Sequence, residues 1–534
     1  MPAVTETGPT DPTPAAGAGG GRPGGISRRP LESWRRWRRA GLAYRAAWLC
    51  ALVVVALLAL MVVRLPWVGD LGIHAATLQR LRHSLTSPGD PLVDSDVPSP
   101  YYSPWMLLLA VAGRIGGLSV FATLHLAAAV DLVLLVTGVR RFVRTLTTRP
   151  AAVPLALLTV TLLYGWQLFT WSGFPGMTSL ALCLAYPSTF AMGAAFHLWA
   201  LARQALARDW GLPGWLGLGL GLALILLSHQ FTGVVTVFGL IGVVAGARPW
   251  PPRAVWLRIA AGVALCAVIL LVWPYYSFFG LLGVGGLDAV HKPLYAHLVG
   301  RFGLLVLGVA ALALRLRRDR RDPLVIMFAL GAVVYAAGGI SGHYALGRVL
   351  PALFFPAQIA LAVEAADGRE KLVRTVLAPL AAVGLLVGCW AQAGTLSYVL
   401  RPAAIPPVLR DAPTQHAWST YSWVRPYVRY GDVVMTADFR ALRQTPAYGG
   451  YTVEPGWPDF FLPDQAARIA DTKRYFAAGT SRAQRLALLR EYHVRWVIET
   501  RGRAGGPATD DPALRETAHG PHGEVLLRVV AKGG

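Results

Sequence analysis

The sequence predicts a mainly α-helical, polytopic membrane protein with about 11 transmembrane helices and a small C-terminal α/β domain. Of the 534 residues, 54% are hydrophobic and only 15% are charged, whereas soluble domains carry about 25% charged residues. Several apolar runs approach the roughly 20 residues needed to cross a bilayer. Arginines gather in the short segments between these runs, which is the positive-inside pattern of membrane proteins.

The net charge of +22 does not indicate a nucleic-acid partner. The basic residues flank apolar runs and do not alternate with aromatic residues along a basic surface. The bias toward Ala, Arg, Gly, Leu and Pro is typical of a GC-rich bacterial genome. All four cysteines fall within apolar runs and are interpreted as small buried hydrophobic residues: Cys50, Cys183, Cys266 and Cys389.

Residues 1–43 predict a disordered, basic cytoplasmic tail. Its first part is rich in Pro, Gly, Ala and Thr and cannot bury a core. Arginines between residues 28 and 39 surround Trp34 and Trp37, a combination typical of the cytoplasmic membrane surface. A cleaved signal peptide is not expected, because both the tail and the apolar run after it are too long.

Residues 44–395 predict the transmembrane domain. Basic segments follow alternate apolar runs, so we expect a cytoplasmic N-terminus and an extracytoplasmic C-terminus. The expected spans cover residues 44–63, 118–139, 152–171, 177–202, 214–228, 231–246, 257–274, 297–315, 323–340, 348–365 and 375–395.

Three local features modify this pattern. Residues 104–116, interrupted by Arg114, predict a helix lying in the outer interface. Pro187 predicts a kink in the fourth span. Residues 228–230 predict a hinge on the outer side between the fifth and sixth spans.

Residues 396–534 predict a separate soluble domain outside the cytoplasm. Strands are expected at 431–436, 494–498 and 524–530, and helices at 464–476 and 481–491. This segment contains no cysteine, so it must fold by packing alone.

The stretch from Gly69 to His74 directly follows the first span and places a carboxylate and an imidazole four residues apart. On a helix, Asp70 and His74 would share one face. An acid at the edge of a bilayer calls for a functional explanation. The alternatives are a solvated loop acid for Asp70 and an ordinary helix-surface residue for His74.

Further polar residues fall at the outer ends of the spans. One acid among several cations suits an anionic, lipid-linked substrate, because phosphate requires positive partners. Each of these residues also has a purely structural interpretation. It could hydrogen-bond the backbone at a turn, simply be exposed, or, for an arginine, place its charge among the lipid headgroups. The candidates are His229, Gln230, His291, Lys292, His343, Tyr344 and Arg348.

Asp94 and Asp96 have a spacing found among metal ligands, but no histidine lies beside them. A divalent metal is therefore possible, and no metal site is assigned.

A cytoplasmic start, one span and an outer loop that opens with Gly-Asp-x-x-x-His together resemble the GT-C superfamily of membrane glycosyltransferases, which use polyprenyl-phosphate-linked sugars. Asp70 matches the position of the family's acid, and His74 matches a variant of the motif. The resemblance extends over the interfacial helices, the later spans and the outer domain. Tyr186-Pro187, Ser228-His229 and Gly347-Arg348 are similar to features of bacterial members.

The resemblance implies a multi-pass plasma-membrane enzyme that moves a hexosyl or pentosyl unit to a cell-envelope glycan, glycolipid or protein acceptor on the extracytoplasmic face. Asp70, with His74 beside it, would act as the catalytic base of an inverting single displacement. Arg348, His229, Lys292 and His343 would bind the donor phosphate. The donor would arrive within the membrane, so no nucleotide-sugar site is expected.

Two other classes of function stay open. A lipid or sugar transporter or flippase would show internal repeats and charged residues near the middle of its spans, and we expect neither here. A non-catalytic membrane scaffold that presents the C-terminal domain would account for the topology but not for the polar residues at the outer ends of the spans.

Overall fold

The computed structural model describes residues 41–283, 286–500 and 511–530 of the chain. The described residues from Ala47 onward belong to one compact unit. Most of the predicted cytoplasmic tail, up to residue 40, lies outside the described residues.

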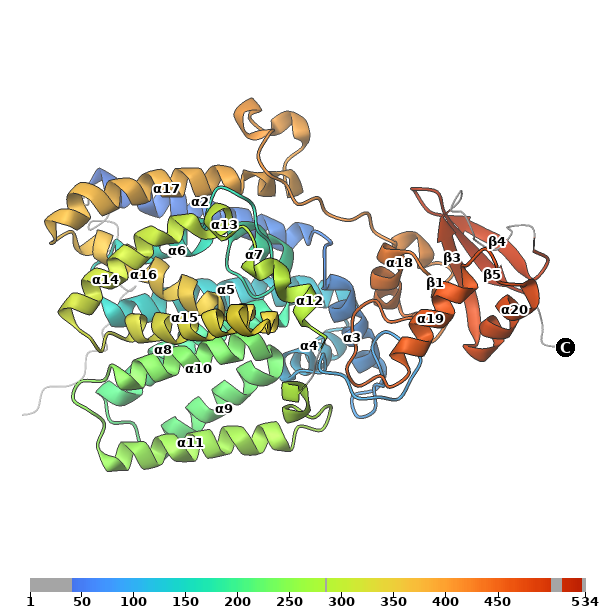
Figure 1. Ribbon diagram of the computed structural model, residues 1–534, viewed down its shortest axis with the longest axis horizontal. Helices are drawn as coiled ribbons and strands as arrows, with labels where there is room; N and C mark the ends of the chain where they lie inside the picture. The colour runs from blue at the N-terminus through green and yellow to red at the C-terminus, as the bar shows by residue number, and fades with distance from the viewer. Residues whose placement is uncertain (1–40, 284–285, 501–510, 531–534) are drawn as a thin grey trace, which may run out of the picture. The chain divides into compact units, whose positions relative to one another are not determined.

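The predicted polytopic helical fold is confirmed (Figure 1). Within the described ranges, seven helical segments are long and apolar enough to cross a membrane. They are α2 (Leu42–Arg64), α5 (Val120–Leu146), α11 (Arg253–Leu271), α13 (Leu298–Phe302) with α14 (Val306–Arg318), α15 (Pro323–Ser341), the 3-10 helix η4 (Tyr344–Val349) with α16 (Pro351–Asp367), and the π-helix η5 (Val373–Leu377) with α17 (Ala378–Ala391).

An eighth candidate span is broken rather than straight. Helices α7 (Met177–Cys183) and α8 (Pro187–Ala207) meet at an angle of 118°. The break falls at Pro187, as predicted: proline favours an extended backbone at the residue before it, here Tyr186, and itself fits the first turn of α8.

The remaining predicted spans are shorter apolar helices: α6 (Ala152–Leu162), α9 (Leu212–Ser228) and α10 (Gln230–Ala245). The hinge at 228–230 is confirmed. The predicted third span, 152–171, is too long, since α6 ends at Leu162. Beyond it the backbone packs against another segment: a Cβ on Gly165 would lie 2.1 Å from the carbonyl oxygen of Gly300, and Gln167 N donates to the same oxygen.

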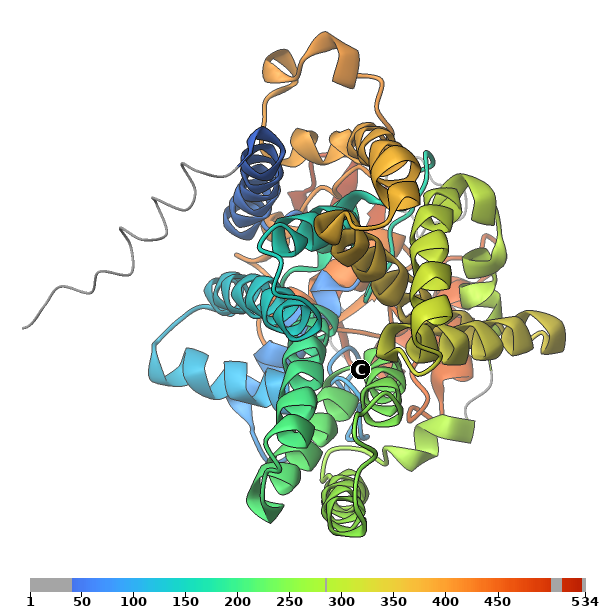
Figure 2. The ribbon, with the colours of Figure 1, turned by 90° about the vertical axis from the view of Figure 1, so that its left-hand side faces the viewer.

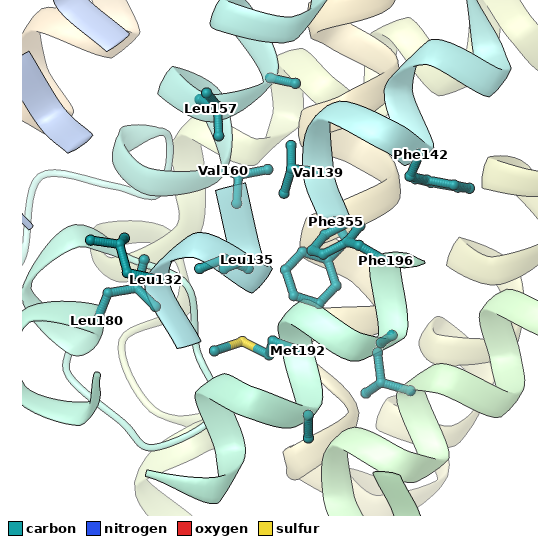
Figure 3. Close-up of a cluster of buried hydrophobic side chains, with 14 of the residues drawn as sticks. Leu132, Leu135, Val139, Phe142, Leu157, Val160, Leu180, Met192, Phe196 and Phe355 are labelled. Carbon is teal, nitrogen blue, oxygen red and sulfur yellow. The ribbon is translucent and has the colours of Figure 1, made fainter. Parts of the chain in front are cut away.

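Close helix packing forms the main core, and Figure 2 looks along several of the helices. Helix α5 lies against α8, where a Cβ on Gly138 would be 2.7 Å from the carbonyl oxygen of Gly193. Small residues at such contacts let membrane helices approach closely. Figure 3 shows the side chains that fill this region, among them Leu132, Leu135, Val139, Met192, Phe196 and Phe355.

Asp131 contradicts the expectation that no span carries an ionisable residue near its middle. It lies in the central part of α5 and is fully buried. Among the described residues, neither of its carboxylate oxygens has a hydrogen-bond partner. The expectation is wrong because the apolar residues around Asp131 conceal one acid within a span whose average is strongly apolar.

The C-terminal region holds a five-stranded sheet in the order β2-β1-β3-β5-β4. Strand β1 pairs in parallel with β2 and β3, whereas β5 is antiparallel to β3 and β4. The strands are β1 (Val433–Thr436), β2 (Tyr451–Thr452), β3 (Val494–Thr500), β4 (Leu514–His519) and β5 (Glu524–Val529), and the helices are α18 (Phe439–Gln444), α19 (Gln465–Tyr475) and α20 (Arg482–Glu491). The predicted α/β character is confirmed, but the sequence pattern does not predict β2, β4 and α18, because they are too short or too polar to give an apolar pattern.

Candidate active site

Asp70 stands immediately before helix α3 (Leu71–His83), at the position that caps a helix N-terminus. Aspartate at this position usually accepts hydrogen bonds from the first backbone N–H groups of the helix, but the side chain of Asp70 makes none. Its Oδ1 atom instead accepts a hydrogen bond of 2.8 Å from the indole Nε1 of Trp457. The residue is half-buried, so its carboxylate is both held and reachable.

His74 lies on the first turn of the same helix and is buried. Its ring meets Tyr186 edge-on, with 4.6 Å between the ring centroids. Burial lowers the pKa of His74 to about 4, and the nearby charge of Asp70 opposes this only in part. The imidazole is therefore neutral near pH 7.

Arg348 and His229 come together from distant parts of the chain. Arg348 is buried in η4, and its Nη2 atom lies 3.1 Å from Nε2 of His229. Gly173 packs closely against both side chains: a Cβ at this position would lie 3.1 Å from Cε1 of His229 and 3.8 Å from Nη2 of Arg348. Its φ of +81° also favours glycine.

These two pairs form one group of side chains, which we call the Asp70 cluster: Asp70, His74, His229 and Arg348. The carboxylate of Asp70 interacts electrostatically with His74 and with Arg348. His74 in turn lies within electrostatic range of His229. The structure thus brings together four of the six residues to which the family resemblance assigns a catalytic or phosphate-binding role.

The other two candidates lie elsewhere. Lys292 is exposed. His343 is exposed, and its Nδ1 atom lies 4.0 Å from Oδ2 of Asp288. By contrast, His291 is buried and its ring lies near that of Phe231. Burial is the main cause of its lowered pKa, and the positive charge of Arg348 lowers the pKa further.

Asp94 and Asp96 are exposed. In the part of the chain that the structure describes, no group of three or more His, Cys, Asp or Glu residues is placed to hold a metal ion.

The C-terminal domain contributes residues to the site that the sequence did not reveal. Trp457 contacts Asp70 across 387 residues of sequence. The guanidinium of Arg443 stacks 3.9 Å from the ring centroid of Phe439 and 5.0 Å from that of Trp457, and it interacts electrostatically with Asp70. No sequence motif marks these contacts, because they depend on how segments far apart in the sequence pack together.

Helix α3 is also the surface on which this domain docks. Arg80 is fully buried and donates hydrogen bonds to the carbonyl oxygens of Gly449 and Gly450. Its guanidinium lies 3.5 Å from the ring centroid of Tyr451. Two carbonyl acceptors and an aromatic face stabilise the guanidinium in this position, while its Nε has no hydrogen-bond partner among the described residues.

Two buried carboxyl groups meet at the same junction. Asp90, in the loop after α3, accepts hydrogen bonds from Leu92 N and Val93 N through Oδ1. Its pKa is raised well above its usual range by burial, by a hydrogen bond with Asp459 and by the charge of that residue. One proton shared between the two carboxyl groups accounts for their contact.

Comparison with known proteins places the fold. No protein-family model matches the chain, and no curated protein sequence does. The structure of ArnT from Cupriavidus metallidurans bound to undecaprenyl phosphate matches with a TM-score of 0.52 and 14% identity, over 90% of this chain and 98% of that one. The arabinofuranosyltransferase AftD from Mycobacteria matches with a TM-score of 0.54 and 14% identity, over 90% of this chain but only 40% of that one.

An oligosaccharyltransferase from Archaeoglobus fulgidus also matches, with a TM-score of 0.44 and 14% identity, over 83% of this chain and 67% of that one. The matches to ArnT and AftD, each over 90% of this chain, confirm the predicted polytopic helical membrane fold.

Proposed function

We propose that the protein is a membrane glycosyltransferase that moves a sugar from a polyprenyl-phosphate-linked donor to a glycan, glycolipid or protein acceptor of the cell envelope. The observation that carries this proposal is the Asp70 cluster, in which an accessible carboxylate lies within electrostatic range of a buried arginine. The GT-C fold, and the undecaprenyl phosphate bound to ArnT, support a donor of this kind.

Arg348 and His229 are the best candidates for binding the donor phosphate. Thr232 N donates to Nδ1 of His229 at 3.2 Å, which leaves the proton of the neutral ring on Nε2. That N–H and the Nη2 group of Arg348 are then two donors side by side, an arrangement that one anionic oxygen satisfies. His229 also caps the N-terminus of α10, where the helix dipole favours negative charge.

Asp70 is the proposed general base. Its carboxylate takes the proton of an acceptor hydroxyl as that oxygen bonds to the anomeric carbon of the sugar. The bond from the anomeric carbon to the lipid-phosphate oxygen breaks in the same step, and the electron pair leaves with the phosphate, whose charge Arg348 and His229 stabilise. One displacement inverts the anomeric centre. His74, neutral and packed against Tyr186, supports the wall of the site.

The proposed orientation puts the N-terminus in the cytoplasm and the Asp70 cluster and the C-terminal domain outside. The arginine-rich end of α14, which finishes at Arg318, supports this, because basic segments stay inside. A reporter enzyme that works only outside the cytoplasm should be active when fused after residue 400 and silent when fused at Arg318. The opposite pattern would contradict the orientation.

Transfer of radiolabelled sugar from a polyprenyl-phosphate donor tests the activity. Asp70→Asn keeps the shape of the side chain but cannot accept the proton, so the rate should fall about 100- to 10,000-fold. Asp94→Asn changes an exposed acid of the same loop and should retain the wild-type rate. Wild-type transfer by Asp70→Asn would refute the proposed role of Asp70.

The buried Asp131 is the observation that favours a transporter, because intramembrane acids often serve transport. The same assay separates the two functions. Asp131→Asn should leave sugar transfer intact in the proposed enzyme. If instead lipid translocation, and not sugar transfer, depends on Asp131, the protein is a transporter.

A further inference from the structure

The position of the Asp70 side chain needs an explanation that α3 does not provide. An aspartate directly before a helix usually stabilises the helix by accepting hydrogen bonds from its first backbone N–H groups. The side chain of Asp70 accepts no such hydrogen bond. Its carboxylate instead accepts a hydrogen bond from Trp457 through Oδ1, which leaves Oδ2 without a donor among the described residues. A residue of the C-terminal domain therefore sets the direction in which this carboxylate points.

Trp457 is itself held rigidly. Its side chain is 9% exposed and packs in a small apolar cluster with Ile73 and Ala76 of α3 and with Leu462. The contact is close because α3 carries glycine at this point. A Cβ on Gly72 would lie 1.7 Å from the carbonyl oxygen of Arg443 and 3.4 Å from Cη2 of Trp457. The indole N–H is thus presented to Asp70 from a packed position.

We propose that Trp457 is a positioning residue for Asp70, so that the C-terminal domain completes the active site. The inference rests on the proposed function. The indole N–H holds Oδ1, which fixes the plane of the carboxylate and directs Oδ2 to the acceptor hydroxyl. A base held in one orientation reacts faster than a freely rotating one.

Trp457→Phe retains an aromatic ring but removes the N–H group together with part of the indole, a loss of ring volume that the control variant described below shares. We expect kcat to fall about tenfold to a hundredfold, since hydrogen bonds to charged groups are among the stronger ones, with the KM of the acceptor unchanged. An unchanged kcat would overturn the proposal. A rise in KM alone would also overturn it, because Trp457 would then be a substrate contact.

The chain offers a matched control. Trp496, in β3, donates its indole N–H to Oδ2 of Asp432 at 2.9 Å, within the same domain but away from Asp70. Trp496→Phe removes an equivalent tryptophan–aspartate hydrogen bond and should leave kcat at the wild-type value. If both variants lose activity equally, the effect is one of domain stability and the positioning role is refuted.

A second measurement separates this proposal from the proposed function. With 15N-tryptophan labelling in lipid nanodiscs, the indole N–H signal that disappears in Trp457→Phe should change its chemical shift in Asp70→Asn, because the hydrogen bond then ends on a neutral amide. This readout needs no sugar donor. If the wild-type protein transfers no sugar but the indole signal changes in Asp70→Asn, the proposed function is refuted while the hydrogen bond between Trp457 and Asp70 is supported. An indole signal that is the same in wild type and in Asp70→Asn would refute the positioning role of Trp457.

Discussion

The guanidinium Nη2 of Arg348 and the imidazole Nε2 of His229 lie 3.1 Å apart, although 119 residues separate them in the sequence. Arg348 is 7% exposed, and the aromatic ring of Phe231 lies 4.5 Å from its guanidinium carbon. Among the described residues its Nε atom has no hydrogen-bond partner. A buried arginine with an unpaired N–H group can donate it to an anionic ligand. An arginine at the membrane surface differs, because its donors are hydrated or contact the lipid headgroups.

The first prediction concerns donor binding. Arg348→Ala should raise the KM for the polyprenyl-phosphate sugar about tenfold to a hundredfold, because a charge-assisted contact to phosphate is lost. Arg348→Lys should recover only part of the loss, since lysine supplies a point charge without the planar fork. Titration of the donor against the purified variants measures both effects.

Arg301 provides the control for this experiment. It donates through Nη1 to the carbonyl oxygens of Pro293 and Ala296 and so has a role in the local structure. Arg301→Ala should leave the KM for the donor unchanged. Equal effects from both alanine variants would count against a specific phosphate contact at Arg348.

The second prediction concerns His74 and pH. The folded-state pKa is about 4, below the value of about 6.5 for an unfolded chain. Between these values the unfolded chain binds a proton that the folded protein does not, so the free energy of unfolding falls as the pH drops from about 6.5 to about 4. The loss is on the order of 3 kcal/mol. Thermal unfolding in nanodiscs should show a shallower pH dependence for His74→Gln, and an unchanged dependence would contradict the burial argument.

The sequence predicted the parts of the fold that depend on local pattern. Apolar runs located the helices, Pro187 located the break, and residues 228–230 located the turn between α9 and α10. The position of Asp70 and His74 on one helical turn also followed from their spacing. These features depend on neighbours in sequence, so periodicity and composition are sufficient.

The contacts that complete the site depend instead on docking, and local pattern gave no sign of them. Trp457 and Arg443 reach Asp70 only because the C-terminal domain packs on α3. Lys292 and His343 illustrate the converse: both were predicted to lie on the same side of the membrane as Arg348, which is buried, yet both are exposed. Residues predicted to lie on the same side of the membrane therefore need not have side chains that contact one another.

The third prediction tests the docking through Gly72. Alanine is the better helix former by about 1 kcal/mol, but here its Cβ would overlap the carbonyl group of Arg443, a backbone group that cannot rotate away. Gly72→Ala should therefore lower the melting temperature and reduce sugar transfer at least tenfold, by moving Trp457 away from Asp70. Gly217, within α9, has nothing within 4 Å of its Cβ position, so Gly217→Ala should be neutral or slightly stabilising. Full activity of Gly72→Ala would show that the close approach is not needed.

The last prediction concerns the carboxyl pair formed by Asp90 and Asp459. Because the folded-state pKa of Asp90 is raised, the folded protein binds more protons than the unfolded chain above about pH 4, and the pair loses stability as the pH rises through that folded-state value. Asp90→Asn keeps an oxygen for Leu92 N and Val93 N and gains an amide donor for Asp459 without any titration. We expect this variant to melt at a higher temperature than wild type at pH 8 and at a similar temperature at pH 5. Asp96→Asn, at an exposed position of the same loop, should match wild type at both values. If Asp90→Asn is destabilised equally at pH 5 and pH 8, the two carboxyl groups do not share a proton, and Asp90 acts only through its bonds to the backbone.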